Sequence, residues 1–350
     1  MSVAPFLSEP RPGLGVRSAG DASLRPLPKL AVVIPALNEA ETIGSVIAAV
    51  PRRLDGVGAV DVILVDDGSR DETRQRAIAA GVDVIATHPQ RRGLVSSFKE
   101  GVREALRRGA SIVVNLDADG QHDPAFIPRL IEPIVAGEAD IVLGVRPLAH
   151  AAGEMSPVRR QGNRVGSWIA RRTLGIEISD VTSGYRAFSR EALMRLNVIS
   201  DYTYTVETLI QAVGKRLTVA EVTVPVRPRL VGESRMTRSV TSYIRKTGGQ
   251  ALRSVLRQHL VALFMRMAFA TGFTAFLCTT LFLLGYHADG AGRHLPALLA
   301  ALLFSVLSVG FFVSSLIADG INSSRRLLED ALYHLKCLEL GEPTSPRDVH

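Results

Sequence analysis

Two long stretches near the C-terminus carry no charged side chain, and they restrict the fold of this chain more than any other feature. Residues 267–285 and 295–318 contain no Asp, Glu, Lys or Arg, and the link between them is short. About 20 apolar residues in a helix cross the roughly 30 Å hydrocarbon core of a bilayer. The pattern predicts two transmembrane helices, at about 265–286 and 295–318, that form a hairpin. The alternative is a buried helical hairpin in a soluble protein.

Basic residues lie on the outer sides of this hairpin. Residues 237–260 combine apolar positions at helical spacing with arginines and lysines, which predicts amphipathic helices at a membrane surface, weakened at Gly248-Gly249. Arg325-Arg326 follow the second stretch, whereas the link holds only Arg293. The positive-inside rule then predicts a multi-pass protein of the cell (inner) membrane with both termini in the cytoplasm. The alternative for residues 237–260 is a helix packed on a soluble domain.

Small side chains recur in the second apolar stretch. Small residues let helices approach closely in a membrane. They are Ser305, Ser308, Gly310, Ser314 and Ser315. A homo-oligomer held together within the membrane is therefore a hypothesis for this chain.

Residues 29–236 alternate short buried strands with helices. The 28 residues before them are rich in Pro, Gly, Ser, Arg and Ala, which predicts a disordered leader. Apolar, β-branched runs predict strands at 30–35, 62–65, 82–87, 111–114, 141–144 and 218–226. Helices are predicted between the first four, and Asn38 with Glu41 would cap the first of them. This order predicts an α/β domain with a mostly parallel, Rossmann-like sheet that binds ligands at the carboxyl ends of its strands.

Acidic and amide side chains follow the fourth predicted strand. Asp117, Asp119 and Gln121 occupy alternate positions there. In an extended segment, alternate side chains point the same way. Three oxygen ligands on one face suit a hard divalent cation whose other ligands are water and substrate phosphate. From these residues alone, an acidic, solvated loop is an equally good interpretation.

Charge and cysteine content narrow the classes of partner. The net charge of +7 and the pI of about 9.8 fit anionic lipid, phosphorylated substrates or nucleic acid. Aromatic residues make up only 5% of the chain and do not alternate with basic ones, so we do not expect nucleic acid to be a partner. Cys278 and Cys337 form no CxxC or Cys/His cluster, which argues against a disulfide framework and a zinc site.

Four motifs, in this order and context, resemble family 2 glycosyltransferases of the GT-A fold. They are Pro35-Ala36-Leu37-Asn38-Glu39, Asp66-Asp67-Gly68-Ser69, Asp117-Ala118-Asp119-Gly120-Gln121 and Asp180-Val181-Thr182-Ser183-Gly184-Tyr185-Arg186. The resemblance covers residues 29–236 and is strongest to dolichol-phosphate mannose synthase and to bacterial polyprenyl-phosphate glycosyltransferases. It implies a GT-A domain at 29–236. The residue patterns after it predict juxtamembrane helices at 237–260, a membrane hairpin within 261–319 and a cytoplasmic tail at 320–350 with a short separate helix at 322–340.

The resemblance implies a nucleotide sugar as the donor. In chain order, the residues that would line its site are Pro35, Leu37, Glu39, Val65, Asp67, Asp117, Ala118, Asp119, Arg229 and Arg235. By the same resemblance, Asp117, Asp119 and Gln121 would hold Mg²⁺ or Mn²⁺ against the donor's diphosphate. Such an ion stabilises the charge that grows on the leaving group by several kcal/mol.

The acceptor implied by the resemblance is a polyprenyl monophosphate held by Arg146 and Ser183. A phosphate monoester is mostly dianionic at neutral pH, since its second pKa is about 6. Such a nucleophile needs positive charge to align it more than it needs a general base. Asp119, Arg146 and Arg229 are therefore the predicted catalytic residues. Direct attack by phosphate at the anomeric carbon would invert its configuration.

Three other residues attract attention near these motifs. Glu207 recurs in the family, although a carboxylate on a helix surface is nearly as good an interpretation. We expect a structural role for His122. Ser179 stands where some mannose synthases carry a basic residue.

Two alternative functions remain. A processive polysaccharide synthase of the same fold usually carries a Gln-x-x-Arg-Trp motif, whereas Gln161-Gly162-Asn163-Arg164-Val165 lacks the tryptophan. A non-catalytic, membrane-anchored nucleotide-sugar-binding protein would have lost acidic motifs that are intact here. The sequence does not indicate whether the sugar is mannose, glucose or N-acetylglucosamine.

Overall fold

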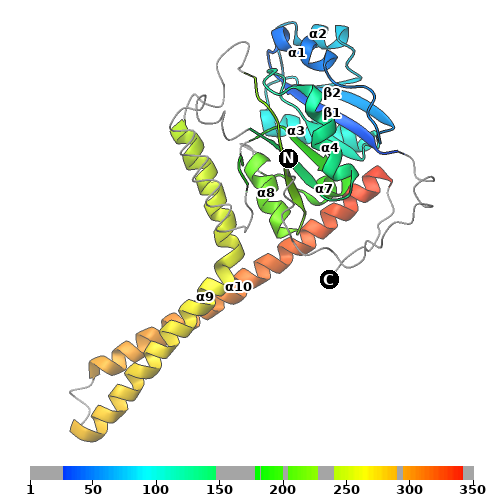
Figure 1. Cartoon of the computed structure of the whole chain (residues 1–350). Coiled ribbons are helices and arrows are strands. Elements are labelled where there is room, and N and C mark those ends of the chain that lie inside the picture. Colours follow the sequence, from blue (N-terminus) through cyan, green and yellow to red (C-terminus); the bar gives the residue numbers. More distant parts are fainter. Residues whose placement is uncertain are drawn as a thin grey trace, which may run out of the picture. The chain divides into compact units, whose positions relative to one another are not determined.

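The chain divides into two compact units, Met1–Ala251 with Lys336–His350, and Leu252–Leu335. The computed structural model (Figure 1) describes residues 27–146, 178–181, 183–199, 204–227, 240–289 and 295–341. Most of the predicted leader, Arg229 and Arg235 therefore lie outside the described residues.

A seven-stranded sheet with the order β3-β2-β1-β4-β6-β5-β7 forms the centre of the larger unit. The strands are β1 (Lys29–Ala36), β2 (Ala59–Asp66), β3 (Val84–Thr87), β4 (Ile112–Asn115), β5 (Ile141–Val145), β6 (Arg186–Ser189) and β7 (Val219–Thr223). β6 runs antiparallel to β4 and β5, and the other neighbouring strands are parallel. The predicted mostly parallel α/β sheet is thus confirmed.

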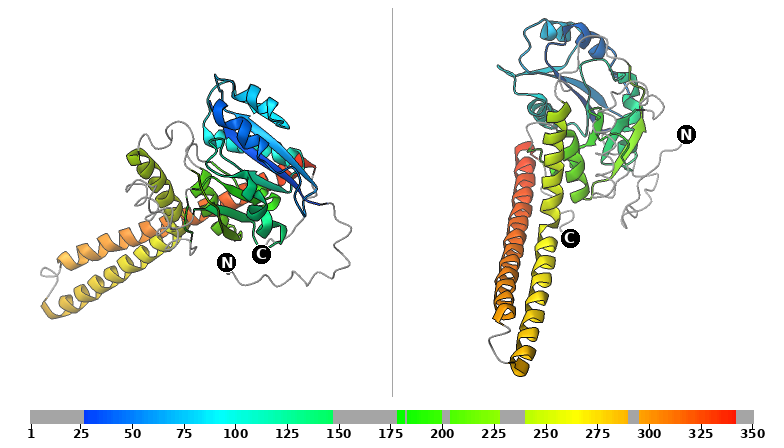
Figure 2. Two further views of the ribbon diagram at one scale, coloured as in Figure 1. Left: turned by 45° about the horizontal axis from the view of Figure 1, so that its top comes forward. Right: turned by 90° about the vertical axis from the view of Figure 1, so that its left-hand side faces the viewer.

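Helices connect these strands and cover both faces of the sheet (Figures 1 and 2). They are α1 (Ala40–Ala48), α2 (Thr73–Ala79), α3 (Leu94–Arg107), the 3₁₀ turn η1 (Pro124–Phe126), α4 (Ile127–Val135), α7 (Arg190–Arg195) and α8 (Tyr204–Gly214).

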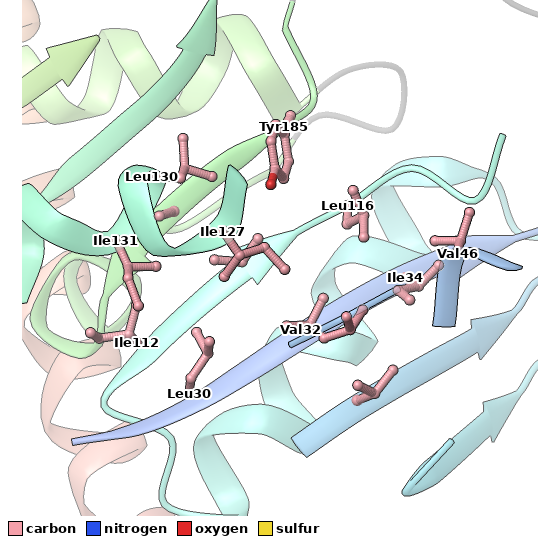
Figure 3. Packing of buried hydrophobic residues seen from close by; sticks show 14 of the residues in the cluster. Leu30, Val32, Ile34, Val46, Ile112, Leu116, Ile127, Leu130, Ile131 and Tyr185 are labelled. Atoms are coloured by element: carbon pink, nitrogen blue, oxygen red, sulfur yellow. The ribbon is translucent and has the colours of Figure 1, made fainter. Parts of the chain in front are cut away.

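The alternation of side chains along β1 gives each face of the sheet its own core. Val32 and Ile34 pack in the cluster that also contains Ile127 of α4, and Figure 3 shows these side chains together. Val33 points to the opposite face, where α3 approaches so closely that a Cβ on Gly101 would lie 2.2 Å from its Cγ1. Glycine at this position therefore sets how closely α3 packs on the sheet.

Two local predictions were wrong. β6 was not predicted as a strand, because it has only four residues and begins with an arginine. Asn38 does not cap α1: the N-cap is Glu39, without a side-chain hydrogen bond. Instead, Asn38 has a φ of 49°, a left-handed conformation that asparagine tolerates better than most residues.

The C-terminal part of the chain forms two long helices, α9 (Val240–Asp289) and α10 (Leu295–Leu340). α9 passes through Gly248-Gly249 without the expected interruption, and α10 continues through the region where a separate tail helix was predicted. Both are long and apolar enough to cross a membrane, and only 11% and 6% of their most apolar windows are buried. This exposure argues against a hairpin buried in a soluble core.

Small polar residues join the two helices within the smaller unit, where they run side by side (Figure 2). The Ser308 hydroxyl donates to the carbonyl oxygen of Ala268 at 2.8 Å, and the Ser315 hydroxyl donates to that of Val261 at 3.2 Å. A Cβ on Gly272 would lie 3.0 Å from the Ser308 hydroxyl. Ser308 and Ser315 therefore pack inside the hairpin, and the hypothesis of a homo-oligomer rests on the other small residues.

Candidate active site

The parallel strands bring the predicted motifs to one edge of the sheet. β1 and β2 pair so that Pro35 lies opposite Val65 and Ala36 opposite Asp66, and β4 flanks β1 on its other side. The segments that leave these three strands therefore start close together. Pro35 and Val65, both predicted to line the nucleotide pocket, are buried neighbours.

Hydrogen bonds connect the loop after β1 to the loop after β2. The Asn38 amide donates to the hydroxyl of Ser69 at 2.9 Å, and the Asn38 side-chain oxygen accepts from the amide of Arg70 at 2.8 Å. The Glu39 amide donates to the hydroxyl of Thr73 at 2.9 Å. These bonds fix the backbone that carries Leu37 and Glu39, both of which stay partly exposed.

Asp67 organises the loop that precedes α3. Its Oδ1 lies 2.9 Å from Nδ1 of His88 and accepts from the amide of Arg92 at 2.8 Å, while its Oδ2 accepts from the amide of Gly93 at 2.9 Å. The carboxylate is buried. Two carboxylate oxygens can accept about four hydrogen bonds, so a base contact remains compatible with these three.

Asp117, Asp119 and Gln121 follow β4 as predicted. Asp117 and Asp119 are partly exposed, whereas Ala118 between them is buried. The Thr42 hydroxyl of α1 donates to the carbonyl oxygen of Ala118 at 2.7 Å, which anchors the segment. Asp119 Oδ1 accepts from the Gln121 amide at 3.1 Å across the turn. Ala118 and Asp119 already lie in a turn, so the extended backbone on which the shared face was predicted ends before Asp119. That the three side chains point the same way stays a prediction.

The donor set of this turn fits Mg²⁺ or Mn²⁺. Two carboxylates and an amide oxygen are hard ligands, and Mg²⁺ is usually bound by one or two carboxylates plus substrate phosphates. Among the described residues, no group of three or more His, Cys, Asp or Glu forms a closed metal cage. Three oxygen ligands leave positions around such an ion for water or phosphate oxygens.

His122 lies in the core beneath this turn. Its ring stacks on that of Tyr185 with centroids 4.9 Å apart. Burial, and then the positive charge of Arg146, lower the pKa of His122 to about 4, so the imidazole is neutral at pH 7. Among the described residues its Nδ1 finds no hydrogen-bond partner. This packing is compatible with the structural role expected for His122.

The end of the last strand is tied to the same turn. His122 forms an isolated antiparallel bridge with Val226. The Arg227 amide donates to the carbonyl oxygen of Gln121 at 2.8 Å, and its guanidinium lies 2.5 Å from Oδ2 of Asp123. The chain therefore passes beside the acidic turn two residues before Arg229.

Arg146 follows directly after β5 and is partly exposed. Its charge reaches the buried imidazole of His122. The arginine thus lies near the acidic turn, at the end of a strand as predicted.

Ser183 does not have the environment expected of a hydroxyl that donates a hydrogen bond to the acceptor phosphate. It is buried, and its hydroxyl donates to the carbonyl oxygen of Gly144 at 2.6 Å. To bind the acceptor phosphate, the hydroxyl would have to turn away from Gly144. Its role in acceptor binding stays a prediction.

A buried arginine holds the segment that contains Ser183. The Arg186 guanidinium donates to the carbonyl oxygens of Ser183 at 2.7 Å, Val181 at 2.9 Å and Thr205 at 2.7 Å. It also donates to the hydroxyl of Thr208 at 2.9 Å. Arg186 therefore fastens this motif to the first turns of α8.

The hydrogen bonds of Glu207 and Ser179 reach two other segments of the domain. Glu207 Oε1 accepts from the amide of Ile199 at 3.0 Å. The amide and the hydroxyl of Ser179 donate to the carboxylate of Glu221 at 2.7 and 2.8 Å. In the described part of the chain, the first contact holds the segment that follows α7, and the other two hold the segment at Ser179 against β7.

Sequence reasoning missed Asn115 and Tyr204. Both are completely buried, and the Asn115 side-chain amide donates to the Tyr204 hydroxyl at 2.8 Å. An asparagine that ends an apolar strand was a signal for the first, because a buried amide needs partners. No local signal marked the second.

The sequence matches a known family and curated relatives. The family model described as glycosyl transferase family 2 matches residues 31–196. The chain is 31% identical over 240 residues to polyprenol monophosphomannose synthase of Mycolicibacterium smegmatis, covering 65% of this chain and 89% of that protein. It is 30% identical over 245 residues to undecaprenyl-phosphate mannosyltransferase of Micrococcus luteus, covering 67% and 95%.

Solved structures share the fold. A crystal structure of glucosyl-3-phosphoglycerate synthase from Mycobacterium tuberculosis has a TM-score of 0.52 and 27% identity, covering 65% of this chain and 81% of that one. A structure of the same synthase with Mn²⁺, uridine diphosphate and phosphoglyceric acid has a TM-score of 0.50 and 26% identity, covering 65% and 78%. With the four motifs at one sheet edge and relatives matched over nearly their full length, this chain belongs to family 2 of the glycosyltransferases, with a GT-A fold.

Proposed function

We propose that this glycosyltransferase moves a hexose from a nucleotide sugar to a polyprenyl phosphate at the cytoplasmic face of the membrane, with inversion. One observation carries the proposal: the same chain contains a family 2 domain with acidic residues after its strands and two apolar helices that are long enough to cross a membrane. The names of the two curated relatives, which contain a polyprenol and an undecaprenyl phosphate, support the acceptor class.

The proposed donor site uses the edge between β1, β2 and β4. Pro35, Leu37 and Glu39 would line the ribose and base, with Val65 and Asp67 at the base. The rigid pairing of Pro35 with Val65 supports this, because a preorganised pocket lowers the cost of ordering a ligand.

Asp117, Asp119 and Gln121 are the proposed metal ligands, with Ala118 beside the donor. A divalent ion bound there would stabilise the negative charge of the leaving diphosphate. The hard oxygen donor set and the Mn²⁺ in the structure of the related synthase support this assignment. Asp119 would hold its carboxylate toward the diphosphate while its Oδ1 keeps the Gln121 amide in the turn.

Arg146 would orient the acceptor phosphate, and Arg229 and Arg235, assigned to the donor site, would add positive charge between donor and acceptor. Two anions, the donor diphosphate and the lipid phosphate, repel one another unless positive charge lies between them. The charge of Arg146 near the acidic turn supports this role. The Arg227 amide bond to Gln121 brings the chain to the same turn shortly before Arg229.

A donor panel tests the proposal. Full-length protein in detergent would be given Mn²⁺, undecaprenyl phosphate and, in turn, UDP- and GDP-linked mannose, glucose and N-acetylglucosamine. Thin-layer chromatography of the lipid extract should show one labelled lipid product with at least one donor, and none after chelation of the metal. No labelled lipid with any donor would contradict the proposal.

A further inference from the structure

Gly184, in the fourth motif, lies close to the Asp117 carboxylate. A Cβ built on Gly184 would lie 3.0 Å from Oδ2 and 3.4 Å from Oδ1 of Asp117. A contact of 3.0 Å is tighter than nine in ten real Cβ contacts, so a side chain at this position would require the carboxylate to move by a few tenths of an ångström. The backbone of Gly184 therefore limits where the Asp117 carboxylate can lie.

A closed triangle of hydrogen bonds holds Gly184 at this position. Asn115 Nδ2 donates to the carbonyl oxygen of Gly184 at 3.0 Å and to the Tyr204 hydroxyl at 2.8 Å. The Tyr204 hydroxyl lies 3.3 Å from the same carbonyl oxygen, to which it donates. Three segments of the chain, β4, the motif before β6 and the first turn of α8, meet in this triangle.

The Tyr204 ring is fixed from outside the triangle. It stacks on Phe98 of α3 with centroids 4.1 Å apart and planes 3° from parallel. Burial, and then the charge of Asp117, raise the pKa of Tyr204, so its hydroxyl stays protonated and remains a donor. Arg186 also fixes the residue before Gly184, because its guanidinium donates to the carbonyl oxygen of Ser183.

Asn115 supports the view that this arrangement serves the site. Its Oδ1 is buried and accepts no hydrogen bond from the described residues. Leaving a buried acceptor unpaired costs about 1–3 kcal/mol. Departures from full pairing concentrate at functional sites, where position matters more than stability.

We infer that Tyr204 and Asn115 are positioning residues, which hold Gly184 against Asp117 and so fix the carboxylate for the metal–diphosphate site. The inference rests on the proposed function, because it needs a metal–nucleotide site at Asp117. It does not require that the acceptor be a lipid.

Calorimetric titration of full-length protein with UDP and with GDP, at a series of Mn²⁺ concentrations, tests the inference without any transfer reaction. Tyr204→Phe keeps the stack on Phe98 and removes only the hydroxyl. We expect about tenfold weaker Mn²⁺-dependent nucleotide binding, equal to about 1.4 kcal/mol, with a Tm within a few degrees of the wild type. Tyr333→Phe, in the C-terminal helix, is the matched control and should bind as the wild type does.

A double-mutant cycle separates positioning from general destabilisation. In an Asp117→Asn background, Tyr204→Phe should cause little further loss, because the carboxylate on which it acts is gone. Gly184→Ala serves as a second variant in case Tyr204→Phe folds poorly. Its added methyl group contacts the Asp117 carboxylate directly, so it should also weaken Mn²⁺-dependent nucleotide binding.

Three outcomes would overturn the inference. If Tyr204→Phe binds the nucleotide as tightly as the wild type does, the positioning role is contradicted. The proposed donor site is not affected by that result, because the wild-type protein still binds Mn²⁺ and nucleotide. An equal loss in both backgrounds would show a merely structural role for the hydroxyl. Absence of Mn²⁺-dependent binding in the wild type, with either nucleotide, would contradict the metal–nucleotide site and the inference with it.

Discussion

Asp119 has two tasks at the residue scale, and they can be separated. One oxygen accepts the amide of Gln121 and shapes the turn, while the carboxylate charge is proposed to bind the metal. An asparagine at this position retains an oxygen acceptor for the turn but loses the negative charge.

Asp119→Asn should therefore keep the fold and lose transfer by about 100-fold or more. Several kcal/mol of transition-state stabilisation correspond to at least two powers of ten in rate. Initial rates with the active donor, together with thermal unfolding, measure both effects. Asp55→Asn, exposed and far along the chain from the motif, is the control. Near-normal activity in Asp119→Asn would remove the metal assignment.

The acidic turn could be predicted from the sequence because the residues that define it are neighbours in the chain. Asp117 and Asp119 follow a β-branched run, and this alone predicts that they lie where a strand leaves the sheet. The positions of Asn115 and Tyr204 could not be predicted, because the partners of Asn115 are 69 and 89 residues away in the chain. The expected cap at Asn38 failed for a related reason, since the partners of Asn38 lie in the loop after β2.

At the scale of elements, strands were predictable where they read as buried apolar runs. β6 did not, because it begins with Arg186, whose buried guanidinium is satisfied by the carbonyl oxygens of Val181 and of Thr205, 19 residues further on. The glycine pair at 248–249 predicted a weak point in a helix. Glycine lowers helix stability by only about 1 kcal/mol, which does not interrupt a helix of 50 residues.

The last turns of α10 belong to the catalytic unit, and one lysine fastens them there. The Lys336 ammonium group donates to the carbonyl oxygens of Leu193, Met194 and Leu196 at 3.3, 3.0 and 2.8 Å, at the end of α7. Burial, and then the charge of Lys215, lower the pKa of Lys336 to about 8. The group stays mostly protonated at pH 7, where a cation suits the C-terminal end of a helix.

Lys336→Met should destabilise the catalytic unit by about 1–3 kcal/mol, because it leaves buried carbonyl groups unpaired. The methionine keeps the apolar stem, so the loss reports the hydrogen bonds. Thermal unfolding of full-length protein in detergent measures it as a fall of several degrees in Tm. Arg326→Met, at an exposed position of the same helix, should leave the Tm unchanged. An unaltered Tm in Lys336→Met would show that this contact contributes little.

At the scale of the whole molecule, one chain contains a glycosyltransferase domain and two apolar helices that are long enough to cross a membrane. The exposed residues of the hairpin include Phe269, Phe273, Phe276 and Leu316, which suit a lipid environment. A polyprenyl phosphate is confined to the bilayer, so an enzyme anchored there meets its acceptor at high local concentration.

The positive-inside rule predicts the orientation of the hairpin from its flanking arginines, and this orientation can be measured directly. A reporter fused after His350 should lie in the cytoplasm, and a reporter inserted in the link at residues 290–294 should lie outside. Protease accessibility in inverted and right-side-out vesicles gives an independent measurement. A C-terminal reporter outside the cytoplasm would reverse the proposed topology.

Mass spectrometry of the lipid product, with NMR to determine its anomeric configuration, tests the central claim most directly. Full-length protein would be incubated with Mn²⁺, undecaprenyl phosphate and the donor selected by the panel. We expect a lipid phosphate that carries one hexose, together with free nucleoside diphosphate, and an anomeric configuration opposite to that of the donor. A sugar polymer, or a lipid phosphate that remains unmodified, would contradict the proposed function.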